Sequence, residues 1–350
     1  MHGPAANWRD FVSADAAPSM TLQQVESALA AADWANAATL DKVDMLVEIA
    51  TGLQVRPKSA DDLLGALRLY DRARELCPPD AVLLAARVEA KRATALQALP
   101  GATTALLEEA MLAFEHALKV LNGHCAAEEI AELEMNLGLS KQTLAAHGIS
   151  RVNDSIAHYH RALRTFTRES YPAEYATLHN NLATAYLAMP ASDPSGRLRE
   201  ALAVQSFEAA LQIVTLKDHP SEYAMLQNNL GNALQNSTSG HPIQNRLRAV
   251  EAYEEALKVR SASNQPGAYA NTVANLALCL SNLPDDVEQP ERGNAKSLER
   301  ARQLYVQALE IFRASGEEAK AAALEDALRE LAESRAAESH FPSYPQEIAG

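Results

Sequence analysis

Apolar and small residues recur along one face of helical segments through most of the chain. In the stretch 219–259, Leu226, Leu230, Ala233 and Leu234 stand at i, i+4, i+7 and i+8, the spacing that places side chains on one face of an α-helix. A second one-sided stripe follows in the same stretch and consists of Ala249, Val250, Tyr253, Ala256 and Leu257. The pattern therefore predicts two amphipathic helices that form a hairpin.

Both stripes recur along the chain with one shared period. Six aromatic residues that are each followed three positions later by alanine recur at a regular interval, at Tyr70, Phe114, Tyr159, Phe207, Tyr253 and Tyr305, with steps of 44, 45, 48, 46 and 52 residues. The first stripe carries an Asn-Leu-Gly or Asn-Leu-Ala triplet that begins at Asn136, Asn181, Asn229 and Asn275, with steps of 45, 48 and 46 residues. Two independent markers with one period indicate a helical solenoid, in which each hairpin buries its apolar face against its neighbours.

These markers resemble those of the tetratricopeptide repeat family. The family has a Leu-Gly pair in its first helix, then alanine, aromatic and alanine in its second helix, and a proline at the next unit. The corresponding residues of one unit here are Leu230, Gly231, Ala249, Tyr253, Ala256 and Pro266. Ser155 replaces the first alanine in the third copy. The units are also longer than the family's usual length of about 34 residues, and the resemblance covers roughly residues 40 to 335.

The resemblance implies an all-α fold, a right-handed α-solenoid of stacked antiparallel hairpins, and a role in peptide or protein binding without a reaction. We expect a flexible arm at 1–20, a capping helix at 21–39, the repeat array at 40–316, a second capping helix at 317–335 and a disordered tail at 336–350.

Glycine and proline mark further boundaries. We expect a helix at 40–52 that ends at Gly52. Segments rich in Pro, Gly, Ser and Asn at 188–197, 236–245 and 282–294 should be loops along one edge of the array.

A row of polar residues lies beside the apolar stripe of the predicted first helices. In the family these helices line a concave groove, and the residue before the repeating leucine reaches the bound peptide. The candidate groove residues are Arg87, Lys91, Asn136, Asn181, Asn229, Asn232, Asn271 and Asn275. A carboxamide offers donors and an acceptor, so such a row could hold the backbone of an extended peptide. The alternative is that each asparagine bonds a neighbouring helix and fixes the stacking.

Arg87 and Lys91 resemble the paired cations with which some family members clamp a peptide's terminal carboxylate. Glu132 on the next hairpin opposes an acidic ligand, however, and two cations one turn apart are commonly a solvated surface. Both interpretations remain open from the sequence.

Charge and composition narrow the classes of partner. The net charge is −14, which opposes binding to nucleic acid or to an anionic membrane surface. The first twenty residues lack the features of a secretory signal, and no apolar run is long enough to span a membrane. We therefore expect a cytoplasmic protein, in which Cys77, Cys125 and Cys279 remain free thiols.

No catalytic constellation is visible, and we expect no enzyme activity, no cofactor and no metal site. His158 and His160 are two positions apart and should point to different faces of a helix. The main hypothesis is a scaffold or adaptor that binds an extended segment of another protein in its groove. The alternative is an assembly or maturation factor that holds a larger enzyme complex through its loop edge or convex face. We expect a monomer, because the charged helix at the C-terminal end opposes self-assembly.

Overall fold

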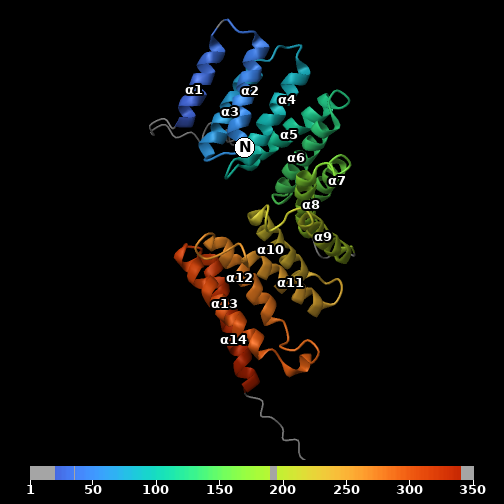
Figure 1. Ribbon diagram of the computed structural model, residues 1–350, viewed down its shortest axis with the longest axis vertical. Helices are drawn as coiled ribbons and strands as arrows, with labels where there is room; N and C mark the ends of the chain where they lie inside the picture. The colour runs from blue at the N-terminus through green and yellow to red at the C-terminus, as the bar shows by residue number, and fades with distance from the viewer. Residues whose placement is uncertain (1–19, 35, 190–194, 340–350) are drawn as a thin grey trace, which may run out of the picture. The chain divides into compact units, whose positions relative to one another are not determined.

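The computed structural model describes residues 20–34, 36–189 and 195–339, and these residues form α-helices without a strand. The arm predicted at 1–20 lies outside the described residues up to position 19, as does the predicted tail from position 340. The chain divides into two units, of which the first ends at Asn181 and the second begins at Leu182 (Figure 1).

The described residues of the first unit form seven complete helices and most of an eighth. They are α1 Met20–Asp33, α2 Thr39–Val55, α3 Ala60–Leu76, α4 Val82–Ala98, α5 Thr104–Leu121, α6 Ala127–Ala145, α7 Val152–Ala162 and α8 Pro172–Leu187. Helix α2 packs against α3, α4 against α5, and α6 against α7, which gives the predicted hairpins. The hairpins follow one another in contact, because α3 also packs on α4 and α5 on α6.

The second unit repeats this arrangement. Its elements after α8 are α9 Gly196–Leu211, α10 Pro220–Asn236, α11 Pro242–Leu257, α12 Pro266–Ser281, the short 3-10 helix η2 Pro290–Arg292, α13 Ala295–Ala314 and α14 Glu318–Ser339. Helices α10 and α11 form one hairpin and α12 and α13 another, α11 packs on α12, and α14 packs on α13 (Figure 1). The all-helical hairpin repeat predicted from the sequence is therefore confirmed.

The repeating small and aromatic residues form the core of both units. Each of the six aromatic side chains is at most 3% exposed, and the small residues four positions before and the alanines three positions after them are fully buried. A small side chain lets two helix backbones approach, and the aromatic ring fills the space that remains between them. The sequence markers therefore coincide with the contacts between helices.

Three of the buried tyrosines also make a recurring hydrogen bond that the sequence pattern did not reveal. The hydroxyl groups of Tyr70, Tyr159 and Tyr253 lie 2.7, 2.6 and 3.0 Å from the side-chain oxygens of glutamines near the ends of the preceding helices, which are Gln54, Gln142 and Gln235. A buried hydroxyl needs such a partner. Each of these three hairpins is thus closed by an aromatic contact and a polar one.

Two glycines of the first-helix marker allow the ring to lie directly on the backbone. A Cβ atom added at Gly231 would stand 2.5 Å from the nearest ring carbon of Tyr253, and one added at Gly138 would stand 2.6 Å from Tyr159. The absence of a side chain is therefore a requirement of packing at these positions.

Some predicted boundaries are wrong. Gly52 does not end its helix, because α2 continues to Val55 and passes through this exposed position. Residues 242–245, predicted as part of a loop, belong to the first turn of α11. Pro242 occupies the first position of that helix, where a missing N–H has no intrahelical partner to lose. Helices also stand at both predicted caps, and a capping role for α1 and α14 stays a prediction.

Candidate functional site

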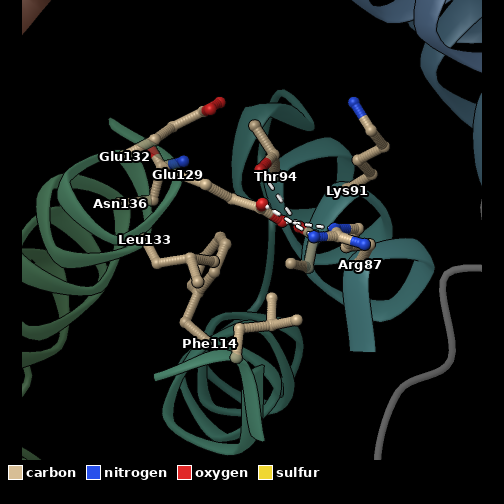
Figure 2. A pocket seen from close by; sticks show the side chains of 10 residues that line it. Arg87, Lys91, Thr94, Phe114, Glu129, Glu132, Leu133 and Asn136 are labelled. Atoms are coloured by element: carbon tan, nitrogen blue, oxygen red, sulfur yellow. Dashed lines mark hydrogen bonds and ion pairs between the residues drawn. The ribbon is translucent and has the colours of Figure 1, made fainter. Parts of the chain in front are cut away.

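The first unit contains a pocket between three helices. It has a volume of about 260 Å³ and is lined by Arg87, Ala90, Lys91 and Thr94 of α4, Phe114 and Leu121 of α5, and Glu129, Glu132, Leu133 and Asn136 of α6. Figure 2 shows Phe114 at the bottom of this pocket, with α4 and α6 on either side. The structure thus brings together three of the predicted site residues, Arg87, Lys91 and Asn136.

An ion pair joins the two walls of the pocket. Arg87 donates from Nε to Glu129 Oε1 at 2.7 Å and from Nη2 to Glu129 Oε2 at 3.1 Å. The hydrogen bonds that the Arg87 guanidinium donates to Glu129 raise the pKa of this guanidinium. Burial and then the charge of Glu129 raise the pKa of the neighbouring Cys125 thiol. This bidentate geometry engages both carboxylate oxygens, so Arg87 is committed to a partner within the protein.

The other two charged side chains of the pocket, Lys91 and Glu132, are exposed and unpaired within the described residues. They extend from α4 and α6 respectively, on the side of the pocket away from Phe114 (Figure 2). The open mouth therefore carries one positive and one negative charge on opposite walls, above an apolar floor.

The predicted asparagines fall into two groups. Within the described part of the chain, no hydrogen bond reaches the side-chain amides of Asn136, Asn229 and Asn275, all half-buried at corresponding positions of α6, α10 and α12. Such a group keeps its donors and its acceptor for water or a ligand.

The remaining predicted asparagines have partners in the chain. Asn232 Oδ1 lies 2.7 Å from the Tyr253 hydroxyl, and Asn271 Nδ2 donates to the Gly267 carbonyl at 2.8 Å. Asn181 Oδ1 lies 3.3 Å from Asn180 Nδ2.

Amides and hydroxyl groups outside the predicted row connect successive first helices. In the first unit, Gln97 of α4 donates to the Asn136 carbonyl and the Ser140 hydroxyl at 3.1 and 2.9 Å. In the second unit, the Thr272 hydroxyl of α12 lies 3.1 Å from Asn228 Oδ1 of α10. These bonds hold adjacent first helices side by side within each unit.

Sequence reasoning missed the roles of the glutamates in α6. Glu129 binds Arg87, Glu134 binds His158 and Arg161, and Glu128 accepts a hydrogen bond from the Tyr171 hydroxyl. Glu129 stands two helical turns before Asn136 and so falls on the same face. The sequence alone could have placed Glu129 on the face of the candidate groove residues, but it could not show that Glu129 contacts Arg87.

The described residues contain no group of three or more His, Cys, Asp or Glu side chains placed to hold a metal ion. Cys77, Cys125 and Cys279 are free thiols, as predicted. No helix in the described ranges combines the length and apolarity that crossing a membrane requires.

Comparison with known proteins finds distant similarity in structure. No protein-family model matches the sequence, and no curated protein sequence matches it. The apo form of RapI is similar over 90% of this chain and 98% of its own, with 13% identity and a TM-score of 0.44. A Rap protein complexed with competence and sporulation factor is similar over 84% of this chain and 80% of its own, with 15% identity and a TM-score of 0.43.

The TPR2AB domain of yeast Sti1 in a pHSP90 complex is similar over 83% of this chain and 99% of its own, with 14% identity and a TM-score of 0.28. Similarity at this level carries no conclusion about a ligand. The helices and the burial of the sequence markers show that the chain is an all-helical hairpin-repeat protein whose repeats resemble tetratricopeptide repeats.

Proposed function

We propose that the protein is a non-catalytic scaffold that binds extended segments of a partner protein along its first helices. The observation that carries this proposal is the set of amides at Asn136, Asn229 and Asn275, which have no partner among the described residues. Asparagine is a mediocre helix former, so its presence in the interior of three equivalent helices calls for a compensating interaction. Asn232 and Asn271 have that interaction within the protein.

An extended peptide backbone supplies what the three amides lack. A carboxamide can donate to a peptide carbonyl and accept from a peptide N–H in the same plane, and it does so without reading a side chain. Each such bond contributes about 1 kcal/mol net. Because the first helices lie side by side within a unit, successive amides can contact the same segment.

The loops favour the amide row over the alternative of an assembly factor that works through its loop edge. The polar groups of the α10–α11 connection are engaged internally, with the backbone N–H and hydroxyl of Thr238 donating to Glu200 at 2.7 and 3.0 Å. In the α12–α13 connection, Asp285 accepts from the backbone of Lys296 and Ser297 at 2.9 and 2.7 Å. These groups are therefore less available to a partner than the amides are.

Selection from a library of linear peptides displayed on phage, with the full chain immobilised, tests the proposal. Selected peptides are then titrated calorimetrically against the wild type, Asn136→Ala and the double variant Asn229→Ala with Asn275→Ala. Loss of one amide contact should raise Kd about fivefold and loss of two about 25-fold. The test therefore sorts peptides by the unit in which they bind.

Asn153→Ala serves as the matched control, because Asn153 is an exposed asparagine on the second helix α7. Its Kd values should equal those of the wild type, and circular dichroism should show unchanged helicity in every variant. Selection of no peptide, or equal effects of the control and the row variants, would overturn the proposed function.

A further inference from the structure

The pocket of the first unit has features that a grip on the peptide backbone does not explain. Phe114 and Leu133, at its base, are at most 5% exposed, and the small side chain of Ala90 leaves the space above them open. A cavity with an apolar floor is suited to a side chain that leaves water on binding, since burial of apolar surface is favourable in proportion to its area.

The charges around the pocket argue against a terminal carboxylate as its ligand. The pocket holds two cations and two anions, and Arg87 is already bound through two hydrogen bonds to Glu129. A carboxylate at the pocket would have to displace Glu129 or bind to Lys91 alone, with Glu132 nearby on the opposite wall. Of the two cations that resembled a carboxylate clamp in the sequence, Arg87 is thus neutralised by Glu129, and Lys91 alone could bind a carboxylate.

We propose that this pocket receives one apolar side chain of leucine size from an extended peptide segment. In this segment, an acidic residue lies on one side of the apolar residue along the chain, and a basic residue lies on the other side. This inference rests on the proposed function and specifies the sequence of the bound segment. The acidic residue lies against Lys91 and the basic residue against Glu132. Complementary charges on the two walls select both the composition and the direction of the segment.

The spacing of the charges follows from helix and strand dimensions. Packed helices lie about 8–10 Å apart, and two residues of an extended chain span about 6.6 Å, with their side chains on the same face. An apolar side chain that enters the pocket between α4 and α6 therefore has its same-face neighbours near the two walls. The expected pattern is acidic, any, apolar, any, basic, read in one of the two chain directions.

The test uses an Asn136-dependent peptide from the selection, made with an acetylated N-terminus and an amidated C-terminus. Four forms of this peptide are compared. Three of them have a central leucine, and their two flanking positions carry one glutamate and one lysine, two glutamates, or two lysines. The fourth form has the mixed charges and a serine in place of the central leucine. For the wild type, the mixed-charge form should bind best, and each mismatched charge should raise Kd about two- to fivefold, the range for exposed ion pairs. The serine form should bind about tenfold more weakly or worse.

Charge reversal in the protein makes the test specific to the two walls. Lys91→Glu gives a mouth with two negative charges, so this variant should prefer the form with two lysines. Glu132→Lys gives two positive charges and should prefer the form with two glutamates. Both positions are exposed, so the variants should fold, which thermal unfolding by circular dichroism verifies.

The failures of the two proposals are distinguishable. If no Asn136-dependent peptide is selected, the proposed function fails in this unit and the pocket inference fails with it. If such peptides bind but the reversals leave the order of the three charged forms unchanged, the pocket inference alone is overturned. Binding that requires a free C-terminal carboxylate would also overturn it, since the site would then be a carboxylate clamp.

Discussion

Replacement of Gly231 by alanine should destabilise the second unit, although alanine is the better helix former. In the interior of an exposed helix this change stabilises by up to about 1 kcal/mol. At Gly231, however, the new Cβ would lie 2.5, 2.8 and 2.8 Å from three carbon atoms of the Tyr253 ring. Ordinary contacts between carbon atoms are about 3.5–4.0 Å, so the ring or the helix must move by roughly 1 Å.

The Tyr253 ring has little freedom to move away. It is fully buried, and its hydroxyl lies 2.7 Å from Asn232 Oδ1 and 3.0 Å from Gln235 Oε1. Overpacking of a core typically costs about 1–3 kcal/mol, and loss of the partner of a buried hydroxyl costs about 1–3 kcal/mol more. After subtraction of the gain in helix propensity, we expect a net loss of about 1–5 kcal/mol.

Urea unfolding followed by circular dichroism at 222 nm measures the change in unfolding free energy, and hydrogen exchange locates it to α10 and α11. Gly52→Ala is the matched control, because a Cβ at this helical glycine meets nothing within 4 Å; it should stabilise by about 0.5–1 kcal/mol. In a Tyr253→Ala background the penalty of Gly231→Ala should vanish. Equal stabilisation by Gly231→Ala and Gly52→Ala in the wild-type background would refute the reasoning.

The remaining predictions concern charged side chains. Asp71→Ala removes one of the two carboxylates that lie 2.6 Å from Arg92, whose side chain is 7% exposed, and leaves Glu109 as the other; it should lower the free energy of unfolding by about 2 kcal/mol. Addition of Arg92→Met should recover much of this loss in the same urea assay. Burial raises the pKa of Glu134, but the hydrogen bonds that it accepts from His158 and Arg161 outweigh burial, so this pKa lies below its usual value. The stabilising effect of Glu134 is therefore complete above the unfolded pKa of about 4.3 and declines as the pH falls through the lower folded pKa, so Glu134→Gln should flatten the acidic part of a plot of Tm against pH. Asp285→Ala should speed amide exchange at the start of α13, where this carboxylate accepts two backbone N–H groups; unchanged exchange would show that the cap is dispensable.

The sequence determined the helices and their pairing because both depend on local periodicity. Side chains at i, i+4 and i+7 share a helix face wherever the helix is placed, so the burial of the aromatic and alanine markers was predictable. The helix boundaries near Gly52 and Pro242 were less predictable from the sequence. Glycine tolerates a helix interior and proline tolerates a first turn, so neither residue alone fixes where a helix ends.

The tertiary structure decided which partner each polar side chain of the site reaches. Asn229 and Asn232 stand on one helix face and look equivalent in the sequence, yet only Asn232 lies beside a buried tyrosine hydroxyl. Arg87 and Lys91 likewise look like a matched pair of cations, until α6 places Glu129 against one of them. Periodicity specifies the direction of a side chain along its own helix. The distance and register between neighbouring helices, set by side-chain packing across the hairpins, specify what that side chain meets.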